Sequence, residues 1–204
     1  SEIPNNRFCL PDADSAKEAE HYLDQKIAEC DSVGGVVECV ISGLPAGLGE
    51  PVFEKLDANL AKAILSIGAV KGFEIGDGFA ATKACGSENN DEFRMDGDKI
   101  VKETNHAGGV LGGISDGSAV IFRAAFKPTP SIAKSQETVT KDGENIDLVI
   151  HGRHDPVVVP RAVVVVESMA AITAMDMLLM SMTSRLDLIQ MFFQVENVDD
   201  SPEQ

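Results

Sequence analysis

The most apolar stretch of the sequence lies between Ala162 and Met180, and it limits how the chain can fold. The stretch is apolar almost all the way round a helix, and it follows Pro160, which fits the first turn of a helix. A stretch of this length could span a membrane. Glu167 and Asp176 argue against that interpretation, because charges in hydrocarbon are costly. The sequence therefore predicts one long helix, from about Pro160 to Arg185, at the centre of the fold and covered on most sides by sheet.

The composition is that of one globular domain with an acidic surface. The chain has 204 residues, of which 44% are hydrophobic, and this is enough for a sizeable core. The formal net charge is -16, which argues against nucleic acid or an anionic membrane as partner, since both need a basic face.

The cysteines and residues 1–4 bear on the cellular location of the protein and on metal binding. No CxxC spacing occurs, so the sequence predicts free thiols rather than a disulfide frame or a metal site, for Cys9, Cys30, Cys39 and Cys85. The segment 1–4 has neither the basic nor the apolar region of a signal peptide. Both observations favour a cytoplasmic protein.

Periodicity predicts an α+β fold. A capping-box pattern predicts a helix that begins near Asp14 or Ser15 and runs to Cys30, and a second amphipathic helix follows Pro51. The polar segment 83–105 is expected to be a long loop, and residues 195–204 an acidic tail. The second helix is expected over 52–67, and strands over 36–41, 69–75, 119–126, 135–140 and 146–150.

Two loops could hold a ligand. Neither proline of the segment 127–131 can donate to a β-ladder, so this segment is a rigid corner that leaves Lys127 and the hydroxyls of Thr129 and Ser131 free. Paired glycines in the segment 108–117 let a backbone approach a flat ligand closely. Tight turns between strands are the alternative explanation for these glycines, and the one that the glycines alone favour.

The segment 151–156 is the strongest candidate for chemistry. It places His151, Arg153, His154 and Asp155 in five positions, on a short loop between a predicted strand and the long helix. Catalytic groups favour such loops because the scaffold on either side fixes them. The alternative is a surface turn with a local Arg–Asp pair, and composition does not separate the two.

Several blocks of the sequence resemble chorismate synthase, in the same order as in that family. They span residues 42–163, and Val157 stands where the family often has cysteine. Each block is weak alone, but the ordered set is highly specific. The blocks are SGLPAGLGEPVFEKLDANLAKAILSIGAVKGFEIGDGF, GSENNDEF, TNHAGGVLGGISDG, FKPTPSI and GRHDPVVVPRAV.

The resemblance implies a fold and a reaction. The family sandwiches helices between antiparallel sheets and forms homotetramers. It eliminates phosphate from 5-enolpyruvylshikimate 3-phosphate to give chorismate, in the shikimate pathway of aromatic amino acid biosynthesis. The 1,4-anti elimination needs reduced FMN, with NADPH as a source of reducing equivalents, so the cofactor carries the hard chemistry while the protein positions it.

The resemblance also implies site residues. Asp155 corresponds to the aspartate that works beside flavin N5 in a serine–aspartate proton relay, and Gly68 stands where the family often has Asn or Gln. His106 and His154 are expected to be structural. Contacts to FMN are expected from Gly68, Ala69, Gly112, Lys127, Pro128, Thr129, Pro130, Ser131 and Arg153.

The resemblance does not include the family's N-terminal half, which carries the acid histidines, the relay serine and the arginine-rich phosphate clamps. Residues 1–204 are therefore expected to be the C-terminal portion of a chorismate synthase domain, which by itself does not turn over substrate. One alternative is a non-catalytic flavin-binding or assembly fragment of that enzyme. Another is an unrelated acidic α+β binding domain.

Overall fold

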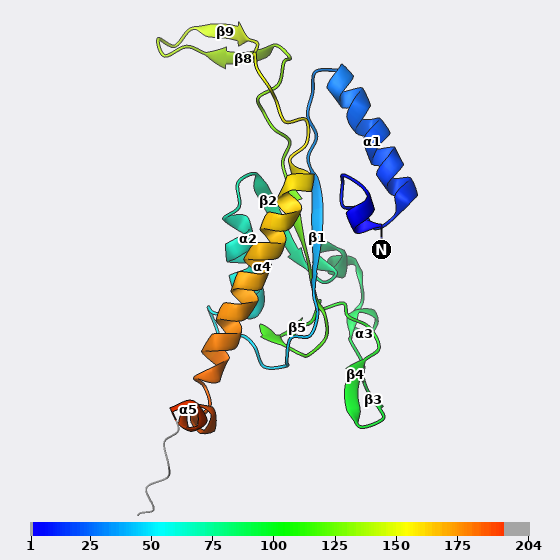
Figure 1. Cartoon of the computed structure of the whole chain (residues 1–204), viewed down its shortest axis with the longest axis vertical. Coiled ribbons are helices and arrows are strands. Elements are labelled where there is room, and N and C mark those ends of the chain that lie inside the picture. The colour runs from blue at the N-terminus through cyan, green and yellow to red at the C-terminus, as the bar shows by residue number, and fades with distance from the viewer. Residues whose placement is uncertain (1, 194–204) are drawn as a thin grey trace, which may run out of the picture.

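A three-stranded antiparallel sheet forms the centre of the computed structural model, which describes residues 2–193. β7 (Val120–Phe126) lies between β1 (Gly35–Ile41) and β2 (Val70–Ile75) (Figure 1). β1 and β7 pair along their whole length, from Gly35 opposite Phe126 to Ile41 opposite Val120. The three strands expected from the sequence are confirmed, and their register places the start of β1 beside the end of β7.

The core lies on one face of this sheet, beneath α2 (Leu56–Leu65) and α4 (Val159–Met182). Alternate residues of β7 are buried there, and α2 contributes Leu56, Leu60 and Ile64, all fully buried. On the opposite face, Arg123 bonds Glu38 and Glu74 across the neighbouring strands. The predicted α+β class with helices packed on an antiparallel sheet is confirmed.

Helix α4 begins where predicted, within one residue, but ends at Met182 rather than Arg185, and it is not covered on most sides as predicted. Its buried stripe includes Ala162, Val166, Ala170 and Met177, whereas four large apolar side chains elsewhere on the helix are more than half exposed, namely Val164, Ile172, Met175 and Leu179. Only one layer of sheet packs on it in the described residues, so the expectation of cover on most sides is wrong. By length and composition alone, α4 is also apolar enough to cross a membrane.

Two helices begin elsewhere than predicted. Helix α1 spans Ala13–Ala28, because the Asp12 carboxylate accepts a hydrogen bond from the Ser15 N–H and caps the helix earlier than expected. Helix α2 begins at Leu56 rather than at Val52. Residues 51–54 form a turn in which Val52 has a φ of 66°, and the Leu56 N–H donates to the Gly113 carbonyl oxygen instead of a preceding turn.

The segment 83–105 is structured, which corrects the expectation of a long loop. The short helices η2 (Gly78–Lys83) and α3 (Gly86–Asn89) precede a hairpin of β3 (Phe93–Asp96) and β4 (Lys99–Lys102). In β3, the apolar Phe93 and Met95 alternate with the charged Arg94 and Asp96, whereas β4 carries two adjacent apolar residues between two lysines; Gly97, with a φ of 59° that suits a tight turn, lies between the strands. The high charge of the segment concealed this alternation.

The remaining elements are short. η1 (Ile3–Asn5) precedes α1, β5 (Val110–Leu111) and β6 (Ile114–Ser115) form a small hairpin, and β8 (Gln136–Val139) pairs with β9 (Asn145–Leu148). The β8–β9 hairpin projects from one end of the molecule, as Figure 1 shows, and α5 (Leu186–Phe193) lies at the other end. The predicted acidic tail, residues 195–204, lies outside the described residues.

Candidate functional site

The two loops with the strongest sequence signals meet at one end of the sheet. Residues 127–131 continue directly from β7, and residues 149–158 lead into α4. The Val33 N–H, just before β1, donates to the Pro156 carbonyl oxygen at 2.8 Å. Because the start of β1 pairs with the end of β7, this bond brings the loop of Asp155 beside the corner of Lys127.

Ala69 joins the same group of residues through its backbone. It has a φ of 71°, which is uncommon for a residue with a side chain. Its carbonyl oxygen accepts a hydrogen bond of 2.9 Å from the Lys127 N–H. Gly68 precedes it on the exposed turn between α2 and β2. Two motifs that lie 58 positions apart in the sequence are therefore fixed to each other.

The segment from Ser32 to Gly34 supports this end of the sheet, although no motif in the sequence predicted that role. The Ser32 hydroxyl donates to the Thr129 carbonyl oxygen at 2.6 Å. A Cβ atom on Gly34 would lie 2.3 Å from the Phe126 carbonyl oxygen and 3.1 Å from the Pro128 nitrogen. The only signal for this role in the sequence is the Gly34–Gly35 pair.

Replacing Gly34 by alanine is therefore expected to displace the corner and to destabilise the fold by roughly 1–3 kcal/mol, the usual cost of overpacking. Urea unfolding measures the effect. Gly86→Ala in α3 is the matched control, because no atom lies within 4 Å of the position of its Cβ. Equal stability of the two variants would show that the segment 127–131 can move to accommodate the added Cβ without loss of folding free energy.

The charges at this end favour an anion. Within residues 2–193, neither Lys127 nor Arg153 forms an ion pair, whereas nine of the other fifteen lysines and arginines do. The Thr129 Oγ1 atom is buried without a hydrogen-bond partner. Buried hydroxyls are nearly always bonded, so this atom is available to a bound water or to a polar group of a ligand.

Asp155 borders a cavity of about 230 Å³ between its loop and the end of α1. Its carboxylate is paired with the Arg161 guanidinium, from the first turn of α4. The local Arg–Asp pair considered for this loop thus exists, but with Arg161 rather than Arg153. The His154 Nε2 atom lies 3.0 Å from the Ile150 carbonyl oxygen, and this contact braces the loop.

Gly112 lies at the opposite end of the sheet from the other expected FMN contacts. With Gly113 it forms the turn between β5 and β6, and both have a positive φ, as tight turns between strands require. Gly113 bonds the start of α2, whereas Ala69 follows the end of α2. The ten residues of α2 span about 15 Å and the seven of β7 span roughly 20 Å, so the two ends are well separated.

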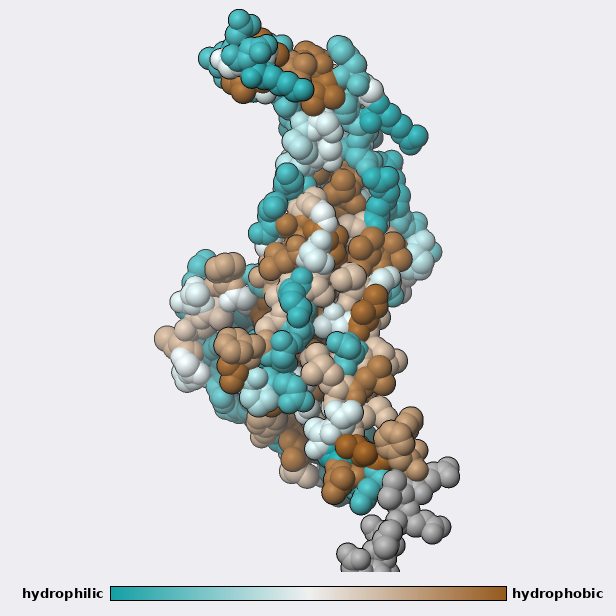
Figure 2. Space-filling view, turned by 90° about the vertical axis from the view of Figure 1, so that its left-hand side faces the viewer, coloured by the Kyte–Doolittle hydropathy of each residue, from teal (hydrophilic) through white to brown (hydrophobic). Residues whose placement is uncertain are grey.

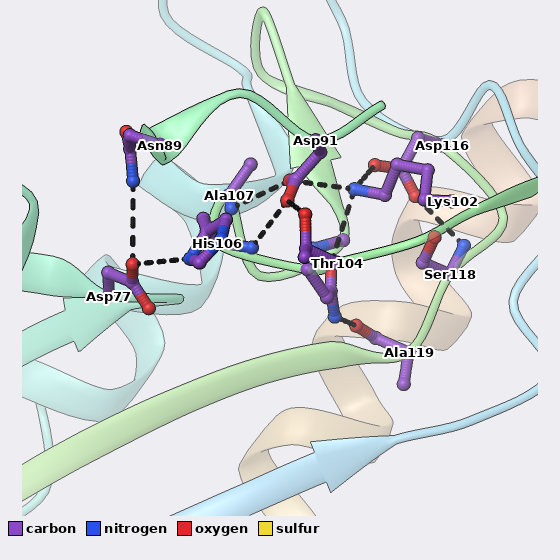
Figure 3. A network of polar contacts seen from close by, with 12 residues as sticks. Asp77, Asn89, Asp91, Lys102, Thr104, His106, Ala107, Asp116, Ser118 and Ala119 are labelled. Carbon is purple, nitrogen blue, oxygen red and sulfur yellow. Dashed lines mark hydrogen bonds and ion pairs between the residues drawn. The ribbon is translucent and has the colours of Figure 1, made fainter. Parts of the chain in front are cut away.

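A buried polar cluster lies beside this Gly112 turn. The Lys102 Nζ atom lies 2.6 Å from the Asp116 carboxylate, 3.1 Å from the Asp91 carboxylate and 3.2 Å from the Asn105 side-chain oxygen (Figure 3). The Lys102 and Asp91 side chains are each only 3% exposed. Lys102 is the last residue of β4, so the cluster fastens the β3–β4 hairpin to the body of the protein.

Asp91 is the most strongly bonded carboxylate of the cluster. Burial by itself would raise its pKa, but hydrogen bonds from the Ala107 N–H, the Thr104 hydroxyl, the His106 N–H and Lys102 outweigh burial and hold the pKa well below the usual range. Asp116 behaves in the same way: burial opposes the shift, and hydrogen bonds from Lys102 and Ser118 lower its pKa. Both carboxylates are therefore ionised near neutral pH.

His106 extends the cluster to the turn after β2. Its Nδ1 atom lies 2.7 Å from the Asp77 carboxylate, and its carbonyl oxygen accepts a hydrogen bond from the Asp77 N–H (Figure 3). These reciprocal bonds agree with the structural role expected for this histidine. Within residues 2–193, no group of three His, Cys, Asp or Glu side chains could hold a metal ion.

Comparison with known proteins gives a consistent family. The family model for chorismate synthase matches residues 1–179. The chain is 64% identical over 193 residues to the chorismate synthase of Agathobacter rectalis, covering 95% of this chain and 53% of that protein. It is 63% identical over 188 residues to that of Lachnoclostridium phytofermentans, covering 92% of this chain and 51% of that protein.

Comparison with solved structures finds the same family. A crystal structure of chorismate synthase superposes with a TM-score of 0.74 at 31% identity, covering 89% of this chain and 48% of that chain. The chain therefore spans about half the length of the proteins that it matches.

Proposed function

Because this chain belongs to the chorismate synthase family, we propose that it contributes half of an active site that eliminates phosphate from 5-enolpyruvylshikimate 3-phosphate with reduced FMN. The observation that carries the proposal is the cationic end of the sheet. There, the loops that carry Lys127 and Arg153 both bond the segment 32–33, next to the buried Thr129 hydroxyl, which has no hydrogen-bond partner within the described residues, in a chain with a net charge of -16. Cations left unpaired in so acidic a chain are suited to an anionic ligand.

The residues present fit a flavin with a phosphate group. Lys127, Arg153 and the Thr129 hydroxyl would bind anionic groups of FMN or of the substrate, and the backbone of Ala69 would lie against them. When bound, reduced FMN supplies electron density to the substrate as phosphate leaves. The Asp155 carboxylate would hold a proton beside the flavin once its ion pair with the Arg161 guanidinium is broken.

The rest of the site would come from the part of the family fold that this chain does not span. Charge develops on the leaving phosphate and needs cationic and acidic groups fixed around it. Homotetramer formation, NADPH as a source of reducing equivalents and a cytoplasmic location are parts of the same proposal. The alternative, a flavin-binding or assembly unit without activity, is favoured by the Arg161–Asp155 ion pair, which leaves the carboxylate engaged in the chain alone.

Titration with FMN tests the proposal. Replacing Lys127 by alanine is expected to weaken FMN binding by roughly 1.5–3 kcal/mol, the value of a hydrogen bond to a charged group. This corresponds to a rise in Kd of about 10- to 150-fold. Lys141→Ala, in the turn between β8 and β9, is the matched control and should leave the Kd unchanged. Equal affinity of both variants and the unmodified chain would make the segment 127–131 a structural corner only.

A further inference from the structure

The segment 31–34, between α1 and β1, bonds both loops of the proposed site. The Ser32 hydroxyl donates to the Thr129 carbonyl oxygen in the proline-containing corner, at 2.6 Å. The next residue bonds the other loop, because the Val33 N–H donates to the Pro156 carbonyl oxygen at 2.8 Å. Two consecutive residues therefore hold the corner on one side and the loop of the candidate catalytic carboxylate on the other.

The corner 127–131 is stiff, so one bond can orient all of it. Pro128 and Pro130 fix their own φ angles, and each restricts the residue before it to an extended conformation. The corner would therefore turn as one piece about its first hydrogen bond, which joins the Lys127 N–H to the Ala69 carbonyl oxygen. Bonds further along the corner prevent this rotation. They come from the side chains of Ser32, to Thr129, and of Gln136, to Pro130.

Of these two bonds, the one from Ser32 connects the corner to the central sheet. Gln136 is the first residue of β8, and the β8–β9 hairpin projects at the upper end of the molecule (Figure 2). A two-stranded hairpin is at best marginally stable by itself, so a bond from it fixes the corner poorly. Ser32 instead precedes β1, which pairs with β7 along its whole length. Its hydroxyl is therefore held in the frame of the sheet.

Asp31 fixes the backbone from which the Ser32 hydroxyl reaches the corner. One carboxylate oxygen accepts a hydrogen bond of 2.9 Å from the Ser32 N–H, and the other lies 2.6 Å from the Lys134 Nζ atom. The hydrogen bond from Lys134, followed by that from the Ser32 N–H, holds the pKa of Asp31 below its usual range. The carboxylate is therefore ionised near neutral pH and keeps both bonds.

We propose that Ser32 is a positioning residue of the proposed site. Its hydroxyl sets the orientation of the corner, and thereby of the Lys127 side chain and the Thr129 hydroxyl, relative to the loop of Asp155. Because its hydrogen is donated to Thr129, Ser32 acts through the corner rather than on the ligand. The inference rests on the proposed function, since FMN is the ligand that the corner would bind.

Titration of the whole chain with FMN tests this role. Ser32→Ala removes the donor, so that FMN would have to fix the corner itself. We expect the Kd to rise about 2- to 12-fold, the effect of one neutral hydrogen bond on an equilibrium. Ser181→Ala, near the end of α4, is the matched control. It also removes a hydroxyl that donates to a carbonyl oxygen, that of Leu178 at 2.7 Å, and should leave the Kd unchanged.

Two further comparisons separate positioning from a general loss of structure. Ser32→Thr and Ser32→Val have nearly the same shape, but only threonine keeps the donor, so the valine variant should bind FMN more weakly. In a double-mutant cycle, Ser32→Ala should raise the Kd less when Lys127 is already alanine, because the side chain that it displaces is then absent. Circular dichroism of each variant checks that the fold is kept.

The outcomes distinguish this inference from the proposed function. If the unmodified chain does not bind FMN, the proposed function is wrong, and the positioning role is wrong with it. If the chain binds FMN and Ser32→Ala leaves the Kd unchanged, only the positioning role is wrong. The same conclusion follows if Ser32→Thr and Ser32→Val bind FMN equally well, or if Ser32→Ala has the same effect with and without the Lys127 side chain.

Discussion

Replacing Lys102 by methionine is expected to destabilise the protein by about 3–5 kcal/mol, the usual cost of breaking a buried ion pair by removing one partner. Methionine keeps most of the side-chain volume but leaves Asp91 and Asp116 buried without their cation, whose nitrogen lies 3.1 Å and 2.6 Å from the two carboxylates. Urea unfolding followed by circular dichroism measures the effect.

The control for this substitution lies on the same strand. Lys99→Met, at an exposed position of β4, should change stability by no more than the usual 0.5 kcal/mol or so of surface substitutions. A similarly small loss in Lys102→Met would show that water or a shift of the hairpin replaces the buried cation, and that the cluster does not fasten the hairpin.

The same cluster predicts how stability depends on pH. The pKa of Asp91 and that of Asp116 are lowered in the folded chain, so the two carboxylates stabilise the fold above their unfolded pKa of about 3.9. This contribution is lost as pH falls from there through the lowered values. The difference between the unmodified chain and Lys102→Met should therefore narrow below about pH 4, because protonated carboxyls no longer need the cation.

Replacing Asp155 by asparagine is expected to lower turnover roughly 10²- to 10⁴-fold, the range typical of removing a general acid or base. An amide cannot relay a proton, although it has the size of the carboxylate. The assay requires a complete site. A chimaera in which the Agathobacter rectalis enzyme supplies the part that this chain does not span provides one, since the shared part is 64% identical.

Two measurements separate catalysis from structure in this test. The Kd for FMN should stay within a few-fold of the unmodified chimaera, because the amide introduced by Asp155→Asn occupies the same space as the carboxylate. Asp147→Asn, an exposed position on β9, serves as the matched control and should keep full turnover. Near-normal turnover in Asp155→Asn would remove Asp155 from the catalytic residues and leave it as the partner of Arg161.

Local sequence patterns predicted the elements whose cause is local. The alternation in β7 and the prolines at 128 and 130 depend on neighbouring residues, so the strand and the corner after it could be predicted. The start of α2 could not, because Leu56 bonds Gly113, which lies 57 positions away. The hairpin at 93–102 was missed because a buried lysine, paired with two distant carboxylates, looks like a surface charge in the sequence.

In the candidate site, too, contacts between distant positions could not be predicted from the sequence. The resemblance to the family indicated Lys127, Arg153 and Asp155 as candidate site residues, but it did not indicate the side chains that hold their loops. Ser32 belongs to no motif in the sequence, and its bond to Thr129 spans 97 positions. The cover of α4 was wrong for a related reason: a helix apolar on all sides predicts that something packs on each side, but not that the same chain provides it.

Because Gly112 lies far from the other expected FMN contacts, the coupling energy between substitutions at Gly112 and at Lys127 is a useful measurement. Gly112 and Lys127 lie at opposite ends of the sheet and share no partner in the described residues, so substitutions at the two positions should change folding free energy additively. For the free energy of FMN binding, no contact within one chain couples the same two positions. If a double-mutant cycle on FMN affinity departs from additivity, one flavin interacts with both positions. The flavin would then either extend from one end of the sheet to the other, or contact the Gly112 turn of a neighbouring subunit.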